Sequence, residues 1–124
     1  MNWDFLIKNK NSLCVSTDTR NLPAGCVFFA LHGEHFDGNK FAKQALESGS
    51  SLAVIDNSEY ALPEGTLLVP STLLALQELA RAWRRELALP IIGITGTNGK
   101  TTTKELLATV LSTKYHLHYT QGNL

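Results

Sequence analysis

A glycine-rich loop constrains the fold of this chain more than any other feature. Residues 93–103 read Gly-Ile-Thr-Gly-Thr-Asn-Gly-Lys-Thr-Thr-Thr. The loop follows an apolar run over 91–94 and precedes an amphipathic stretch over 100–112. A buried strand, a glycine turn and a helix, in that order, are typical of a phosphate-binding loop. The pattern therefore predicts a parallel α/β unit at this end of the chain.

The residue types of the loop suit a nucleotide. Glycines let successive backbone N–H groups point at one anion, and the start of a helix adds positive charge. Lys100 can reach the β- and γ-phosphates as a catalytic group, and the Thr101 hydroxyl can bind Mg²⁺. The predicted ATP-binding residues are Gly96, Thr97, Asn98, Gly99, Lys100, Thr101 and Thr102. The strict motif has glycine where this chain has Ile94, so a simple strand-to-helix turn remains an alternative.

Pro90 divides the sequence into two predicted domains, 1–88 and 89–124. In the first domain we expect a small mixed α/β fold. A short helix or turn is predicted over 3–8, and helices are predicted over 40–48 and 71–89. The predicted strands cover 13–16, 26–31, 52–55 and 66–69. In the second domain, 91–94, 100–112 and 115–119 predict one βαβ unit. Because a lone parallel pair cannot cover both faces of its sheet, we expect the chain to be part of a longer protein.

The longest predicted helix begins after Ser71, a good N-cap. Its predicted apolar stripe consists of Leu73, Leu76, Ala80, Trp83 and Leu87. Three arginines, Arg81, Arg84 and Arg85, lie mostly elsewhere on the helix. They form either a phosphate patch or, as we favour, the solvated face of an amphipathic helix.

Charge and composition exclude several classes of protein. Lys+Arg 11 balances Asp+Glu 11, which argues against binding nucleic acid or anionic lipid by bulk electrostatics. No apolar run is long enough to span a bilayer, and the N-terminus lacks the pattern of a secretory signal. We therefore expect a cytoplasmic protein without membrane insertion. Cys14 and Cys26 each lie in an apolar run, which favours two buried free thiols.

Two motif blocks resemble the Mur ligases, the bacterial enzymes that add amino acids to UDP-N-acetylmuramoyl peptides. The loop over 96–102 resembles their ATP loop, whose spacing also departs from the strict motif. The N-terminal blocks 16–20, 25–34 and 36–41 resemble the domain that holds the UDP part of their substrate. The segments 102–105 and 119–124 resemble the branch that adds D-alanyl-D-alanine.

The resemblance implies a three-domain enzyme in which this chain supplies the UDP-binding domain and the start of the ATP-binding domain. The implied substrates are UDP-N-acetylmuramoyl-tripeptide and D-alanyl-D-alanine, joined through an acyl phosphate with ATP and Mg²⁺. A carbamylated lysine of the family lies outside this chain, and family members are expected to be monomeric. The implied contacts to the UDP part are Thr19, Arg20, Asp37, Gly38 and Asn39.

These substrate contacts keep structural alternatives. Asp18 can instead hold Arg20 in an ion pair, and Asp37 can instead cap the helix that follows. The sequence also departs from the family in two places. Thr19 stands where serine is usual, which keeps the hydroxyl. Asn39 stands where histidine is usual, which puts a histidine-specific contact in doubt.

Three other functions stay open at this stage. One is the ligase that adds diaminopimelate or lysine, and another is a UDP-sugar-peptide binding module without catalysis. A generic P-loop kinase or GTPase is the third, although it leaves the N-terminal blocks unexplained. No Asp or Glu follows Glu105, so this chain lacks an acidic second metal ligand there. We therefore expect this chain alone to be catalytically inactive.

Overall fold

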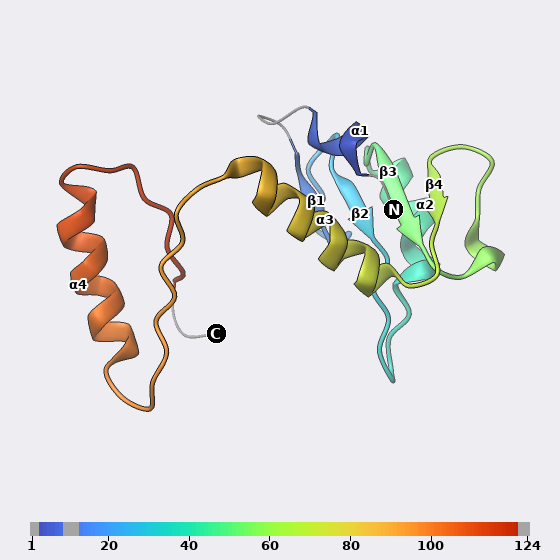
Figure 1. Ribbon diagram of the computed structural model, residues 1–124. Helices are drawn as coiled ribbons and strands as arrows, with labels where there is room; N and C mark the ends of the chain where they lie inside the picture. Colours follow the sequence, from blue (N-terminus) through green and yellow to red (C-terminus); the bar gives the residue numbers. More distant parts are fainter. Residues whose placement is uncertain (1–2, 9–12, 122–124) are drawn as a thin grey trace. The chain divides into compact units, whose positions relative to one another are not determined.

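Four parallel strands organise the first unit of the chain, Met1–Ala88, in a computed structural model that describes residues 3–8 and 13–121 (Figure 1). The strands follow one another across the sheet in chain order: β1 (Val15–Ser16), β2 (Val27–Phe29), β3 (Leu52–Ile55) and β4 (Thr66–Leu68). Each predicted strand of this unit contains one of them. The prediction of a small α/β fold is therefore confirmed.

Helices cover both faces of this sheet (Figure 1). One face packs against α1 (Asp4–Ile7) and α3 (Thr72–Leu87), and the other against η1 (Gly38–Phe41) and α2 (Ala42–Glu47). A short turn of helix, η2 (Ser58–Tyr60), lies in the connection from β3 to β4. Since both faces are covered, β2 is buried at every position, as expected for a parallel strand.

The two cores follow the alternation of side chains along the strands. The core beneath α1 and α3 contains Trp3, Ile7, Val27, Phe29, Val54, Val69, Ala75 and Leu79. The core beneath η1 and α2 contains Phe28, Ala30, Ala42, Ala45, Ala53 and Ile55. Large residues dominate the first core and alanines the helical side of the second, so α2 can approach the sheet closely.

Helix α3 begins where predicted but presents a different face to the core. The Ser71 hydroxyl caps it by accepting a hydrogen bond from Leu74 N. The predicted stripe is confirmed at Leu76 and Trp83, which pack against the first core, and is wrong at Leu73, Ala80 and Leu87, which are exposed. The buried residues are instead Thr72, Ala75 and Leu79. The three arginines, Arg81, Arg84 and Arg85, are exposed, as a solvated face requires.

The prediction of two free thiols is wrong. Cys14 and Cys26 form a disulfide, with their Cα atoms 4.5 Å apart. The register explains the pairing, because Val15 lies opposite Val27 and the preceding residues are therefore neighbours across β1 and β2. Sequence spacing alone does not give this register.

The second unit, Leu89–Leu124, is built around α4 (Lys100–Ser112), at the predicted boundaries. Residues 91–94 and 116–119 have no regular secondary structure and Tyr115 lies in a bend, so the two strands predicted over 91–94 and 115–119 are not present in the described part of this unit. Both segments instead contribute apolar side chains to a groove along α4, with Leu107 and Leu111 on the helix side. Within residues 3–8 and 13–121, no helix is long and apolar enough to cross a membrane.

Candidate functional site

A polar cleft lies at the carboxyl ends of the central strands of the first unit. It has a volume of about 620 Å³. His32 follows β2, Asp56 follows β3, and Pro70 follows β4. In open parallel sheets, ligands bind at this edge because the loops there converge. The lining residues are His32, Gly33, Glu34, His35, Phe36, Asp37, Asn39, Lys40, Asp56, Asn57 and Pro70.

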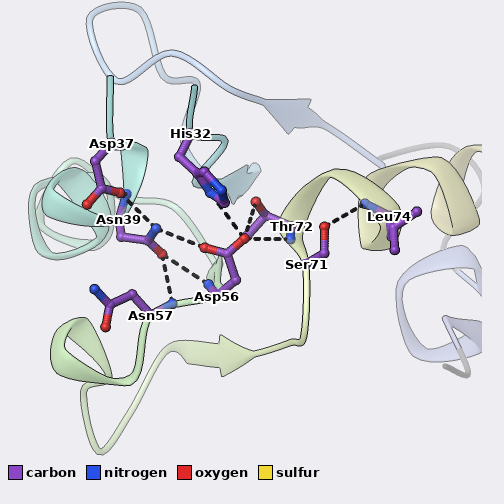
Figure 2. Close-up of polar contacts among 8 residues, drawn as sticks. All are labelled: His32, Asp37, Asn39, Asp56, Asn57, Ser71, Thr72 and Leu74. Atoms are coloured by element: carbon purple, nitrogen blue, oxygen red, sulfur yellow. Dashed lines mark hydrogen bonds and ion pairs between the residues drawn. The ribbon is translucent and has the colours of Figure 1, made fainter. Parts of the chain in front are cut away.

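Asp56, a lining residue of the cleft, is at the centre of a network of polar contacts (Figure 2). Its side chain is only 6% exposed. Oδ1 accepts a hydrogen bond from Asn39 Nδ2 at 2.9 Å, and Oδ2 accepts from the backbone N and the hydroxyl of Thr72 at 3.0 Å each. His32 Nδ1 lies 3.3 Å from the same Oδ2. One carboxylate therefore joins the exit of β2, η1 and the start of α3.

These partners keep Asp56 ionised. Burial by itself raises the pKa of a carboxyl group, but the hydrogen bonds from Thr72 and Asn39 and the nearby His32 outweigh it, so the pKa of Asp56 is lowered. The stabilisation from Asp56 is consequently present above the ordinary carboxyl range and is lost as the pH falls through its folded-state pKa.

Asn39 uses every hydrogen-bonding position of its side chain. Its Oδ1 accepts from the backbone N of Asp56 at 3.0 Å and of Asn57 at 3.3 Å. Its Nδ2 donates to Asp37 Oδ1 at 2.8 Å and to Asp56 Oδ1 at 2.9 Å. The residue is 2% exposed. As placed, the amide has no donor or acceptor left for a ligand.

Asp37 and Gly38 shape the loop that leads into η1. Asp37 Oδ1 accepts from the backbone N of Asn39 at 2.9 Å, so the capping alternative is present in the structure. Gly38 N donates to Leu31 O at 2.9 Å, and a Cβ at Gly38 would lie 2.4 Å from that oxygen. Glycine is required here because the backbones come so close. Phe36 closes the turn, with its carbonyl accepting from Gly33 N at 2.8 Å; it is 53% exposed, and its ring stacks on Phe41 with the centroids 5.8 Å apart.

Thr19 and Arg20 do not line this cleft. Arg20 pairs with Asp18, with Nε 3.0 Å from both carboxylate oxygens. The side-chain hydrogen bond from Arg20 lowers the pKa of Asp18 to about 2. Both side chains are well exposed, at 84% and 46%. The ion pair that the sequence allowed is therefore formed, at the loop that follows β1.

The phosphate loop lies in the second unit and ends at the first residue of α4. Gly96 and Gly99 have φ of +150° and +77°, which L side chains rarely adopt. A Cβ at Gly99 would meet nothing within 4 Å, so the backbone there is open. Lys100 Nζ donates to the carbonyl oxygen of Gly96 across the loop. A lysine over a turn of glycine backbone at a helix N-terminus fits a phosphate group.

A cleft of about 490 Å³ lies beside this loop. Lys100, Thr101 and Lys104 line it from α4, and residues 91–94 and 118–120 line the opposite side. Lys104 Nζ donates to Thr120 O at 2.8 Å, which holds the second segment near the helix. Thr101 thus lies at the loop, but the described residues contain no group of three or more His, Cys, Asp or Glu side chains that could hold a metal ion.

Sequence reasoning missed His32, Asp56 and Thr72. Asp56 carries a signal, because it is the first polar residue after a buried strand and such positions lie at the ligand-binding edge of parallel sheets. Nothing in the sequence indicated that Thr72 and His32 would meet the same carboxylate. That contact depends on the neighbouring positions of β2, β3 and β4.

Comparisons with known proteins agree with both units. Residues 13–84 match the model for the Mur ligase family, catalytic domain, and residues 94–124 match that for the Mur ligase middle domain. UDP-N-acetylmuramoyl-tripeptide--D-alanyl-D-alanine ligase of Bacillus subtilis is 48% identical over 111 residues, covering 88% of this chain and 24% of the relative. The Escherichia coli ligase of the same name is 41% identical over 111 residues, covering 89% and 24%.

A solved structure supports the fold assignment. The crystal structure of MurF ligase from Thermotoga maritima in complex with ADP has a TM-score of 0.78 and 31% identity, covering 90% of this chain and 26% of that one. This chain thus spans about a quarter of the length of the relatives that it matches. With matches to two Mur ligase models and close relatives over nearly its whole length, the chain belongs to the Mur ligase family.

Proposed function

We propose that this chain is the N-terminal part of an ATP-dependent ligase of peptidoglycan precursor synthesis that acts in the cytoplasm. The reaction joins D-alanyl-D-alanine to UDP-N-acetylmuramoyl-tripeptide. The observation that carries the proposal is the 48% identity to a ligase of that name, which extends through both the cleft unit and the phosphate-loop unit.

The cleft unit would hold the UDP part of the substrate. Phe36 offers an exposed aromatic face in the cleft, and His32, His35 and Lys40 offer cationic or hydrogen-bonding groups. Asp37 lines the same space, while Gly38 and Asn39 act by holding the loop in shape. Thr19 and Arg20 would contact the substrate from the loop after β1, outside this cleft.

The phosphate-loop unit would hold ATP. Its phosphates would meet the backbone over 96–99, Lys100 and the first turn of α4, where Thr101 and Thr102 lie. Bound ATP supplies the phosphoryl group that activates the tripeptide carboxylate. Lys100 would stabilise the charge that develops on that group, and Thr101 would contribute one ligand to Mg²⁺.

A second candidate has support of its own. UDP-N-acetylmuramoyl-L-alanyl-D-glutamate--2,6-diaminopimelate ligase of Prochlorococcus marinus is 40% identical over 109 residues, covering 22% of that relative. The two candidates differ in the substrate peptide, which is one residue longer for the D-alanyl-D-alanine ligase. Affinity for the tripeptide substrate against the dipeptide substrate separates them.

The experiment is a titration of the labelled chain followed by amide NMR, with UDP-N-acetylmuramoyl-tripeptide and separately with Mg-ATP. We expect the first ligand to shift amides around the cleft and the second to shift residues 96–102. Lys100→Ala should lose the ATP response, whereas Lys114→Ala, beyond the end of α4, should keep it. Failure of the sugar-peptide to shift any cleft residue would refute the proposed substrate. Failure of ATP alone would refute only the nucleotide site.

A further inference from the structure

The orientation of His32 is set by a buried, immobilised carboxylate. Asp56 cannot rotate freely, because Asn39 holds Oδ1 and both the backbone N and the hydroxyl of Thr72 hold Oδ2. The imidazole of His32 meets that fixed Oδ2 through Nδ1 at 3.3 Å. The ring is therefore oriented by a group that is itself held by two other elements of the fold (Figure 2).

This contact decides which ring nitrogen is available to a ligand. Because Nδ1 lies 3.3 Å from Asp56 Oδ2, the carboxylate favours a proton on Nδ1, and Nε2 is the ring nitrogen left for a ligand. The His32 side chain is 55% exposed and lines the cleft, so Nε2 is accessible there. In the neutral Nδ1–H ring Nε2 is an acceptor, so donation to an anion requires a second proton from solvent on Nε2; the carboxylate behind the ring stabilises the resulting cation, whose Nε2–H can donate a charge-assisted hydrogen bond.

The same carboxylate already accepts a hydrogen bond from the N-terminus of α3. The first N–H group of that helix, from Thr72, donates to Asp56, and the Ser71 hydroxyl accepts from Leu74 N. A phosphate at that helix end would meet the charge of Asp56 and be repelled. His32 and Asp56 both line the cleft, and the exposed imidazole offers an approaching anion a partner other than the carboxylate. The other ionisable groups lining the cleft are Glu34, His35, Asp37 and Lys40.

We propose that His32 contacts a phosphate of the nucleotide-sugar substrate through Nε2, and that Asp56 is the positioning residue that presents it. This inference rests on the proposed function for the identity of the ligand. The positioning of His32 by Asp56 does not depend on the identity of the ligand, and a separate measurement tests it.

The positioning is tested by the tautomer of neutral His32, read from imidazole nitrogen shifts in the full chain. We expect the Nδ1–H form in the unsubstituted protein and a shift toward the Nε2–H form in Asp56→Asn. Thr72→Val is the matched control, since it removes one hydrogen bond to Asp56 but leaves the His32 contact in place. An unchanged tautomer in a folded Asp56→Asn variant would overturn the positioning role. If that variant does not fold, an Nε2–H tautomer in the unsubstituted chain or in Thr72→Val overturns it equally.

The phosphate contact is tested by comparing UDP with uridine in NMR titrations. In the unsubstituted chain UDP should bind more tightly than uridine, and His32→Gln should narrow that difference by about tenfold. His116→Gln is the control, since His116 lies in the second unit and does not line the cleft, and it should leave the affinities for both ligands unchanged. A His32→Gln variant that weakens both ligands equally, or neither, overturns the contact while leaving the UDP site intact. Failure of the unsubstituted chain to bind either ligand overturns the proposed function and this contact together.

Discussion

At the scale of single residues, the cleft depends on side chains whose hydrogen bonds are internal. Asn39 bridges the start of η1 to the end of β3, and its four partners are backbone N–H groups and carboxylates of the same unit. If such a residue is removed from a buried site, its former partners lose their hydrogen bonds. The free energy of unfolding then falls by more than those bonds contributed to it. The residue that stands at the family's histidine position therefore has a structural role in this chain.

Asn39→Ala should lower the free energy of unfolding by about 2–4 kcal/mol. The reason is that the backbone N–H groups of Asp56 and Asn57 lose their acceptor in a buried position. Chemical denaturation measures this. Asn57→Ala is the control, because it removes one exposed capping bond to Glu59 N and should cost only about 0.5–1 kcal/mol. Equal effects of the two substitutions would contradict this account.

Asp18 should titrate with a pKa of about 2. The NMR chemical shift of its carboxyl carbon, recorded as a function of pH, measures this value. Since the folded-state pKa is lowered, any stabilisation from the pair with Arg20 is present above the ordinary value of 3.8 and disappears as the pH falls through about 2. Arg20→Gln should move the pKa back toward 3.8. Lys43→Gln, on α2, should leave the titration in place. A pKa that stays near 2 without Arg20 would contradict the ion pair.

At the scale of elements, contacts between helices and strands decide which face of a helix is buried and how closely two backbone segments approach. The start of α3 illustrates this. Thr72 is 1% exposed because both its N–H and its hydroxyl bind Asp56, which turns Leu73 and Leu74 outward. The stripe predicted from leucine spacing is displaced for that reason. The apolar contacts of Ala75, Leu76, Leu79 and Trp83 and the polar contact of Thr72 together fix which side of the helix faces the sheet.

Gly38→Ala should destabilise the chain by about 2–4 kcal/mol, because its new Cβ would lie 2.4 Å from Leu31 O and 2.9 Å from the Ala30 carbonyl carbon. Gly33→Ala is the matched control in the same loop, since a Cβ there meets nothing within 4 Å. It should change the free energy of unfolding by less than about 0.5 kcal/mol. Urea denaturation of both variants tests the difference. A tolerated Gly38→Ala would mean that the loop can withdraw from β2.

At the scale of the whole molecule, the two units differ in how much they bury. The first unit contains two cores, whereas in α4 Ala108 is the buried residue within the described range. Large apolar side chains of the second unit remain exposed, among them Ile91 at 67%, Leu106 at 63% and Val110 at 65%. Buried apolar area is the main source of folding free energy, so stability should be concentrated in the first unit.

Hydrogen exchange should therefore separate the units. We expect the amides of β2 and β3 to exchange far more slowly than those of α4, since local opening costs little where few apolar contacts are lost. Exchange followed by NMR on the intact chain gives both values in one sample. Protection in α4 equal to that in β3 would show that the second unit is stabilised in a way these contacts do not explain.

Phosphate release from ATP should be no faster with this chain than with its Lys100→Ala variant. The loop supplies a lysine and a threonine, but the described residues hold no acidic cluster for the metal. A coupled phosphate assay with Mg-ATP and UDP-N-acetylmuramoyl-tripeptide checks this. Turnover by the unsubstituted chain well above the variant would show that the residues needed for the chemistry are already present.

The sequence by itself determined the features that depend on local order. A glycine loop between an apolar run and an amphipathic stretch gave α4 its boundaries, and short apolar runs located all four strands of the first unit. The loop residues and Ser71 owe their conformations to backbone freedom and capping, which act over a few residues. These signals also carried the resemblance to the Mur ligases.

Only the tertiary structure decided what meets across the sheet. The disulfide of Cys14 with Cys26, the rotation of α3 and the contact of His32 with Asp56 all depend on which strands are neighbours and in what register. Residues 91–94 and 115–119 remained without a ladder although their patterns predicted strands, because strand formation requires a hydrogen-bonding partner and apolar alternation does not supply one. Local pattern locates the four strands of the first unit and α4, and pairing between distant segments fixes the site.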